Sequence, residues 1–212
     1  MKIIKAFTAI ATCMIFCSAS LRNHSGEWIS LFDGKTLNGW KVGNHAATFK
    51  VDNGMIVVNG ETAHLFYDGD VQNHNFKNFE FKADVMTMPG SNSGIYFHTT
   101  YQESGWPAKG YEVQVNNSHT DWRRTGGLYA IDDVKEVFVK DNEWFTQYIK
   151  VEGKRVIVKL NDKIVVDYTE PENVQRPADM AGRVISNGTF ALQGHDPNSK
   201  VYFKNIMVKP MP

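Results

Sequence analysis

Apolar and polar residues alternate along most of the chain, in short runs that begin near Trp28. Within a run every second residue is apolar, and Gly, Asn or Asp stands between one run and the next, which is the pattern of half-buried strands joined by turns. The alternation predicts strands over residues 27–32, 48–51, 55–58, 64–67, 76–88, 94–101, 110–116, 126–131, 143–152, 155–160, 163–168, 189–193 and 200–209.

Two of the connections between these strands are short enough to predict hairpins. Gly153 and Asn161 stand in them, and both residue types tolerate a positive φ. No stretch of twelve or more residues has a helical period, and no linker or internal repeat divides the chain. We therefore expect an all-β fold, a jelly-roll sandwich of two antiparallel sheets, in a single domain over residues 21–212.

The first twenty residues have the three-part pattern of a secretory signal peptide. Lys2 and Lys5 precede an almost wholly apolar run over residues 6–17, and small residues follow. The run is short for a membrane span, so no stable span is expected after cleavage; a transmembrane anchor is the alternative. Lipoprotein attachment at Cys17 is not favoured, because bulky residues precede it. The expected location is the periplasm or the extracellular space.

Cysteine content and net charge exclude several classes of function. Both cysteines, Cys13 and Cys17, lie in the signal segment, so the mature chain has no disulfide, thiolate metal site or cysteine nucleophile. The full chain has 23 basic and 23 acidic residues, and the chain without residues 1–20 has 21 and 23. This balance argues against a nucleic-acid partner, which normally requires a basic surface. A neutral substrate is expected.

The strand predicted at residues 110–116 carries a row of polar groups on one face. Alternation places Glu112, Gln114 and Asn116 together, with Tyr111, Val113 and Val115 on the opposite face. An acid and two amides can donate to and accept from sugar hydroxyls, so the row predicts a carbohydrate-binding groove. The alternative is a solvated outer face of the sheet.

Further candidates lie on the preceding strand, in two long polar loops and near the C-terminus. His98 shares the alternation of Gly94 and Tyr96, so a hairpin would place it beside Glu112 or Gln114; a structural histidine is the alternative. Tyr129 offers a phenol as an acid or a stacking ring. The candidate substrate contacts, several of them in loops 102–109 and 117–125, are Asn92, His98, Gln114, Asn116, Trp106, His119, Trp122, Arg124 and Gln193.

Several familiar catalytic patterns are missing from the sequence. No Ser-His-Asp motif, glycine-rich phosphate loop or His-x-x-x-His metal motif is present. A conventional glycosidase requires two carboxyl groups at a fixed separation. The residues that follow Glu112 on its face are amides, which weakens this mechanism, although Asp121 could supply the second carboxylate.

Five motifs follow one another in the order of a known family, after an opening segment at residues 31–40 (LFDGKTLNGW). They lie at residues 92–95 (NSGI), 112–114 (ExQ), 125–129 (TGGLY), 192–195 (LQxH) and 203–206 (FKNI). Over about residues 27–210 the chain resembles the 3-keto-disaccharide hydrolase family. It departs from the family at His98, where many members have Arg, at Asp196, where Gly is common, and at Lys204, where Arg is frequent.

The resemblance implies a concanavalin-A-like jelly roll and an activity on 3-keto-glycosides, by hydrolysis or by lyase and hydratase steps. A ketone at C3 acidifies the proton at C2, so elimination of the C1 oxygen requires one base, one electrophile and one acid. The expected base is Glu112 or His195, with His98 and Gln114 at the ketone and Tyr129 assisting the leaving group. A divalent metal ion held by Glu112 and by one or more of His98, His195 and His119 would polarise the ketone.

Two other functions remain open from the sequence. The same jelly roll could serve as a lectin-like module that binds carbohydrate without turnover, because a fold does not by itself imply catalysis. Alternatively, the protein could be a conventional two-carboxylate glycosidase that acts on unoxidised glycans.

Overall fold

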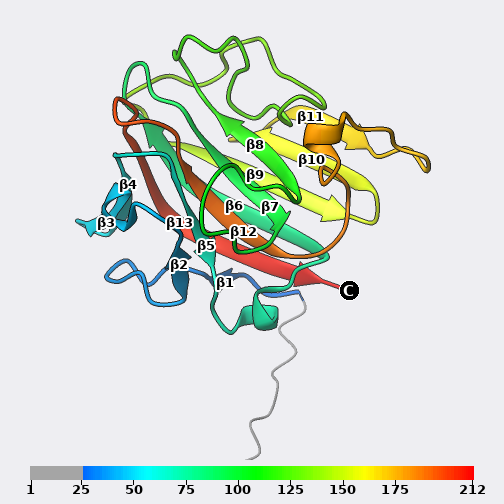
Figure 1. Ribbon diagram of the computed structural model, residues 1–212, viewed down its shortest axis with the longest axis horizontal. Helices are drawn as coiled ribbons and strands as arrows, with labels where there is room; N and C mark the ends of the chain where they lie inside the picture. Colours follow the sequence, from blue (N-terminus) through cyan, green and yellow to red (C-terminus); the bar gives the residue numbers. More distant parts are fainter. Residues whose placement is uncertain (1–25) are drawn as a thin grey trace, which may run out of the picture.

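The computed structural model describes residues 26–212, so the predicted signal peptide lies outside the described part (Figure 1). Within residues 26–212 no helix is long and apolar enough to cross a membrane. The strands are β1 (Ile29–Ser30), β2 (Trp40–Val42), β3 (Phe49–Asp52), β4 (Met55–Val58), β5 (Ala63–Tyr67), β6 (Asn78–Thr87), β7 (Ser93–Thr99), β8 (Tyr111–Val115), β9 (Phe145–Glu152), β10 (Arg155–Leu160), β11 (Lys163–Thr169), β12 (Thr189–Gly194) and β13 (Val201–Met211). Three short 3-10 helices are η1 (Ala46–Thr48), η2 (Val71–His74) and η3 (Ala178–Met180).

The strands form two antiparallel sheets. The larger sheet has the order β11-β10-β9-β6-β13-β4-β3, with β1 paired to β13, and the smaller has the order β2-β5-β12-β7-β8. Figure 1 views the molecule with the smaller sheet in front of the larger one. The all-β jelly-roll sandwich expected from the sequence is confirmed.

The hydrophobic core lies between the two sheets. Buried and partly exposed residues alternate along β6 and β9, which is why each strand presents one apolar face to the core. Phe190 of β12 lies at the centre of an aromatic cluster, with ring centroids 4.7 Å from Phe76, 4.8 Å from Phe79 and 4.7 Å from Phe81. Burial of one such ring contributes about 1.5–3 kcal/mol.

The strand predictions are largely confirmed, with two differences. Gly153 and Asn161 have φ angles of 58° and 52° in the two predicted hairpins. The strand predicted at residues 126–131 is wrong, because positive φ at Gly126 and Ala130 interrupts the extended backbone and leaves Leu128 in isolated bridges. Strand β2 was not expected, since three residues are too few for alternation to be visible.

The smaller sheet is polar on the face turned away from the core. Tyr111 and Val113 of β8 pack into the core, whereas Glu112 and Gln114 point to the opposite side, together with Tyr96 of β7 and Gln193 of β12. The alternation predicted for the strand at residues 110–116 is thus confirmed. This outer face carries the candidate site.

Candidate active site

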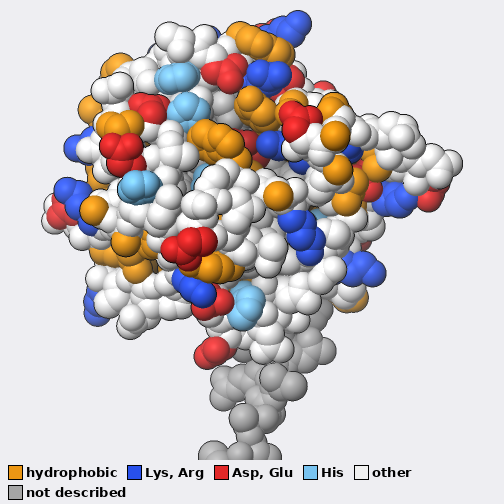
Figure 2. Space-filling model, viewed as in Figure 1, with side chains coloured by type: hydrophobic (Ala, Val, Ile, Leu, Met, Phe, Trp, Pro, Cys, Tyr) orange, Lys and Arg blue, Asp and Glu red, His pale blue; other side chains and the backbone are white. Residues whose placement is uncertain are grey.

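A cavity of about 440 Å³ opens on the outer face of the smaller sheet. Tyr96, Glu112, Gln114 and Gln193 from the strands contribute to its lining. The surrounding loops add Asn92, Trp106, Asp121, Tyr129, Arg183 and His195. Figure 2 shows this side of the molecule, where histidine side chains lie close to hydrophobic and acidic ones. A concave site with a few converging polar groups is the usual form of a ligand-binding pocket.

Glu112 is held within a set of hydrogen bonds. Its Oε2 accepts a hydrogen bond from the Tyr96 hydroxyl at 2.8 Å, and its Oε1 accepts one from Nε2 of Gln193 at 2.9 Å. Gly94 lies beneath the carboxylate, and a Cβ at this position would lie 2.5 Å from Oε1 of Glu112. The glycine therefore allows the Glu112 side chain to cross over β7.

Two opposing effects set the protonation of Glu112. Burial raises the pKa of its carboxyl group, and the charge of Arg183 and the hydrogen bonds from Tyr96 and Gln193 oppose this rise. Nη2 of Arg183 lies 3.6 Å from Oε2 of Glu112; the Glu112 side chain is buried and that of Arg183 is 11% exposed. Burial is the larger effect, so the pKa of the Glu112 carboxyl group lies above its ordinary value.

His195 and Trp106 form another part of the lining. His195 directly follows β12, and the Trp106 ring lies 5.4 Å from its ring at an interplanar angle of 40°. Trp106 is 49% exposed, and its ring also lies against the buried His64, at a centroid distance of 5.7 Å. An exposed indole supported from below is suited to stacking against a sugar ring.

Arg183 and Tyr129 line the cavity together. The guanidinium group lies 5.1 Å from the centroid of the Tyr129 ring, and its Nη1 donates to the Tyr129 carbonyl oxygen at 3.4 Å. Burial raises the pKa of the Tyr129 hydroxyl, so this group is a neutral phenol near pH 7.

The segment between β11 and β12, which carries Arg183, is tied to the sheet by Glu170. Oε2 of Glu170 accepts hydrogen bonds from the Tyr111 hydroxyl and, at 2.8 Å, from the backbone N–H of Ile185. Arg176 donates to the hydroxyls of Tyr111 and Tyr168 at 3.0 and 2.9 Å. These contacts hold the segment in the position from which Arg183 reaches Glu112.

Most of the predicted site residues converge on the cavity. The lining includes Glu112, His195, Tyr129, Asn92, Gln114, Trp106 and Gln193. Asn116 and Arg124 instead organise the loop over residues 117–125: Nδ2 of Asn116 donates to the Arg123 carbonyl at 2.7 Å, and Nη1 of Arg124 donates to Oδ1 of Asn116 at 3.1 Å. Trp122 is 46% exposed and lies outside the lining, beside the Arg123 guanidinium.

The expected position of His98 is wrong. A φ of 55° rotates its side chain out of the alternation of β7, and the side chain is fully buried between the rings of Phe79 and Phe97. Its Nδ1 accepts the Ser186 N–H at 3.2 Å, and Nε2 lies 2.8 Å from the Lys77 carbonyl oxygen. Burial lowers the pKa of His98 to about 4. His98 therefore does not join Glu112 and His195 at the cavity, either for substrate contact or as a third metal ligand.

Sequence reasoning missed Arg183, Tyr96 and Asp179 as lining residues. Tyr96 could have been found, because it shares the alternation of Gly94 on β7. Arg183 and Asp179 lie in a long segment without strand periodicity, and nothing in the local pattern indicates that it folds back over the sheet.

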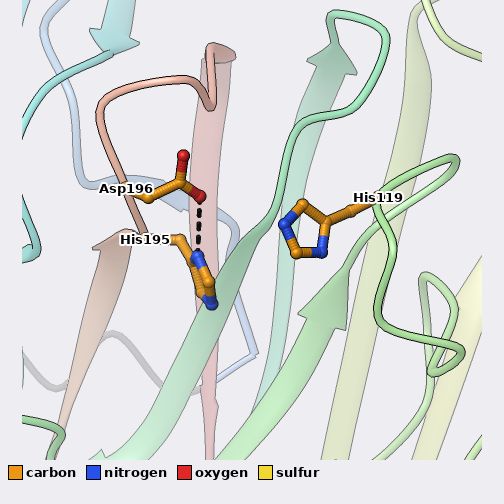
Figure 3. A group of neighbouring side chains, drawn as sticks. All are labelled: His119, His195 and Asp196. Atoms are coloured by element: carbon orange, nitrogen blue, oxygen red, sulfur yellow. Dashed lines mark hydrogen bonds and ion pairs between the residues drawn. The ribbon is translucent and has the colours of Figure 1, made fainter.

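His119, His195 and Asp196 are the residues within the described part of the chain that come closest to a metal-binding group, with donor atoms within 4.8 Å of one another (Figure 3). Their hydrogen bonds suit an ion poorly. Nδ1 of His119 accepts the Asp121 N–H at 3.1 Å, which leaves the proton of the neutral ring on Nε2. Asp196 already accepts hydrogen bonds on both oxygens.

Comparisons with known proteins identify the family of the chain. A family model described as a 3-keto-alpha-glucoside-1,2-lyase-like domain matches residues 27–209. A protein of Bacteroides thetaiotaomicron named 3-keto-disaccharide hydrolase is 30% identical over 227 residues, which cover 86% of this chain and 78% of that protein.

Solved structures share the fold. A proposed glycosyl hydrolase of Parabacteroides distasonis superimposes with a TM-score of 0.72 at 24% identity, over 87% of this chain and 94% of the other. The carbohydrate-binding module CBM66 of Bacillus subtilis gives a TM-score of 0.57 at 16% identity, over 79% and 93%. At these identities the structures show the jelly-roll fold alone.

Proposed function

Because the chain belongs to the 3-keto-alpha-glucoside-1,2-lyase-like family, we propose that it cleaves the glycosidic bond of 3-keto-glycosides, including 3-keto-disaccharides. The family and the name of the Bacteroides relative support a carbohydrate-active enzyme of this kind. The observation that carries the proposal is the convergence of Glu112, Gln193, His195 and Trp106 on one cavity.

The proposed reaction begins with loss of the C2 proton to a base, Glu112 or His195. The electrons of the C2–H bond form an enolate with the C3 carbonyl group. When the enolate collapses, C1=C2 forms, the bond from C1 to the leaving oxygen breaks, and that oxygen takes a proton from water or from the Tyr129 hydroxyl. Addition of water across C1=C2 would complete a net hydrolysis. The base returns its proton to solvent, and Tyr129, where it was the donor, takes a proton back from solvent.

The polar groups of the cavity support a carbohydrate substrate. Oε1 of Gln114 and Oε1 of Gln193 are buried and have no hydrogen-bond partner among residues 26–212. Buried acceptors are normally paired, so a small rotation toward the cavity would offer both to substrate hydroxyls. With Trp106 as a stacking surface, the cavity offers the mixture of amide and aromatic contacts that sugars require.

Export remains part of this proposal, and the metal ion predicted from the sequence is an alternative that the chelator test below decides. Export, with residues 1–20 as the signal peptide, is consistent with an enzyme that acts on external carbohydrate. A divalent metal ion at the ketone would supply Lewis-acid polarisation. Among the ligands expected for it, Glu112 and His195 line the cavity and His98 does not.

The test compares a 3-keto-glucoside with its unoxidised parent on the purified protein, with and without chelator. Cleavage of the keto compound alone is the expected result. Release of sugar from the parent would instead indicate a two-carboxylate glycosidase, for which Asp121 and Asp179 line the same cavity as Glu112. Saturable binding of the sugar without any product would contradict an enzymatic function and would indicate a lectin-like module.

A further inference from the structure

His195 and Asp196 form an orienting pair at the end of β12. Nδ1 of His195 lies 2.8 Å from Oδ2 of Asp196 (Figure 3). A carboxylate only accepts hydrogen bonds, so the ring must present Nδ1–H to it. In the neutral ring this leaves the lone pair on Nε2.

Hydrogen bonds from its neighbours hold the Asp196 carboxylate in place and favour its charged form. Oδ1 accepts the Asn198 N–H at 2.8 Å and the Ser199 N–H at 3.1 Å, while Oδ2 accepts the Ser199 hydroxyl at 2.7 Å. Burial alone would raise the pKa of Asp196, but the hydrogen bonds from Ser199, His195 and Asn198 outweigh it and lower the pKa. The carboxylate is therefore a fixed anionic acceptor for the imidazole.

His119 has the opposite hydrogen-bonding pattern. Its Nδ1 accepts from the Asp121 backbone, and Nδ2 of Asn92 lies 3.5 Å from the same atom. The Asn92 amide is itself oriented, because its Oδ1 accepts from Nε2 of Gln114 at 3.2 Å. Nε2 of His119 thus carries a proton, and Figure 3 shows the His119 ring edge turned toward His195 and Asp196, at a distance of 5.4 Å between the two ring centroids.

We propose that Asp196 is a positioning residue that fixes the tautomer of His195 and makes Nε2 of His195 the base that removes the C2 proton. This assignment rests on the proposed function and chooses between its two candidate bases. The proton moves from C2 to Nε2, and the resulting imidazolium keeps its Nδ1–H on the Asp196 carboxylate, whose charge stabilises it. His119 supports the pair by turning its Nε2–H edge toward Asp196.

The geometry favours His195 over Glu112 for this role. Both oxygens of Glu112 are engaged by Tyr96 and Gln193, and Arg183 lies beside them. His195 lines the cavity and is 30% exposed, with its partner on the side remote from Nε2. A base requires a free lone pair within reach of substrate, and His195 offers one.

The first experiment does not depend on activity. NMR of protein labelled with ¹⁵N-histidine at neutral pH should show protonated Nδ1 and unprotonated Nε2 for His195, and the reverse for His119. In Asp196→Ala, His195 should lose its preference for the tautomer that is protonated on Nδ1. A wild-type spectrum with protonated Nε2 on His195 would overturn the proposal even if the enzyme cleaves 3-keto-glycosides.

The second experiment uses turnover of a 3-keto-glucoside. Asp196→Asn should lower kcat about tenfold and Asp196→Ala about 100-fold, with little change in KM. The acidic limb of the pH profile of kcat should move to lower pH in both, because the anion that stabilises the imidazolium is gone. The matched control is Asp68→Asn, in an exposed His74–Asp68 pair outside the cavity, which should leave both constants unchanged.

Chemical rescue separates a base from a metal ligand. Added imidazole should restore part of the activity of His195→Ala, and chelator should leave the wild type unaffected. Loss of wild-type activity with chelator, restored by a divalent ion, would overturn the assignment in favour of a metal-bound His195. If the wild type cleaves no 3-keto substrate, the proposed function fails while the NMR result still tests the tautomer.

Discussion

At the scale of single residues, the site depends on small steric and hydrogen-bonding details. Gly94 leaves room for the Glu112 carboxylate, and Gln193 and Tyr96 hold that carboxylate in place. His64 lies under Trp106 as a neutral ring, since burial, with a smaller contribution from the charge of His195, lowers its pKa to about 3. Each of these features makes a prediction of its own.

A methyl group at position 94 should disable the site without unfolding the protein. In Gly94→Ala the new Cβ would lie 2.5 Å from Oε1 of Glu112, so the carboxylate must move away from Gln193. We expect kcat/KM for a 3-keto-glucoside to fall about 100-fold. The control is Ile95→Val on the core side of β7, which should cost about 0.5–1.5 kcal/mol of stability and leave kcat/KM unchanged. Unchanged kcat/KM in Gly94→Ala would contradict the placement of Glu112.

Neutralising Glu112 should have a comparable effect. Glu112→Gln removes the charge that faces Arg183 and replaces an acceptor of the Gln193 amide by a possible donor, so we expect kcat to fall by about 100-fold or more. Glu136→Gln, at an exposed position, is the matched control. Steady-state kinetics and circular dichroism of both variants provide the measurement. Full activity in Glu112→Gln would remove Glu112 from the mechanism.

His64 should make the protein less stable in acid. The unfolded chain binds a proton at His64 below about pH 6.5, whereas the folded protein binds it only near pH 3, so the free energy of unfolding falls as the pH falls between these values. His64→Leu should reduce this slope by about 1.4 kcal/mol per pH unit. Urea unfolding at several pH values between 4 and 6 measures the slope.

The control for this measurement is His45→Asn, because His45 is exposed and Asn tolerates its φ of 54°. The free energy of unfolding of His45→Asn should change with pH as steeply as that of the wild type. Equal slopes in His64→Leu and the wild type would show that His64 is not buried in the neutral form.

At the scale of elements, strands provide the floor of the cavity and loops provide its walls. The strands β7, β8 and β12 present Tyr96, Glu112, Gln114 and Gln193 in adjacent rows because their pairing register is fixed. The segment between β11 and β12 brings Arg183 to the same place only because Glu170 and Arg176 anchor it. Function should therefore be sensitive to this anchor.

Removing the charge of Glu170 should loosen the segment that carries Arg183. Glu170→Gln weakens its bonds to the Tyr111 hydroxyl and the Ile185 N–H, so we expect a loss of about 1–3 kcal/mol in stability and a higher KM. Glu172→Gln is the control, because Glu172 is exposed and its ion pair with Lys154 should contribute about 0–1 kcal/mol. Thermal unfolding, KM and the rate of proteolysis within residues 171–188 give the comparison. Equal values in the two variants would contradict the anchoring role.

At the scale of the whole molecule, the larger sheet supports the smaller one, whose outer face carries the site (Figure 1). The sequence was sufficient to predict the two-sheet fold and the polar face of β8, because both depend on alternation within one strand. It was insufficient for Arg183, whose approach to Glu112 depends on the path of a long irregular segment. It misplaced His98, because a single positive φ reverses the direction of a side chain and leaves no mark in the pattern.

The most direct test of the proposed chemistry is turnover of a 3-keto-glucoside in deuterated water, with mass and NMR analysis of the released sugar. Removal of the C2 proton followed by addition of water predicts deuterium at C2 of the product, and cleavage of the keto compound alone. A saturated sugar product that keeps its original hydrogen at C2, with no deuterium there beyond the level of its non-enzymatic exchange, would contradict elimination. Such a result would instead indicate direct hydrolysis of the glycosidic bond.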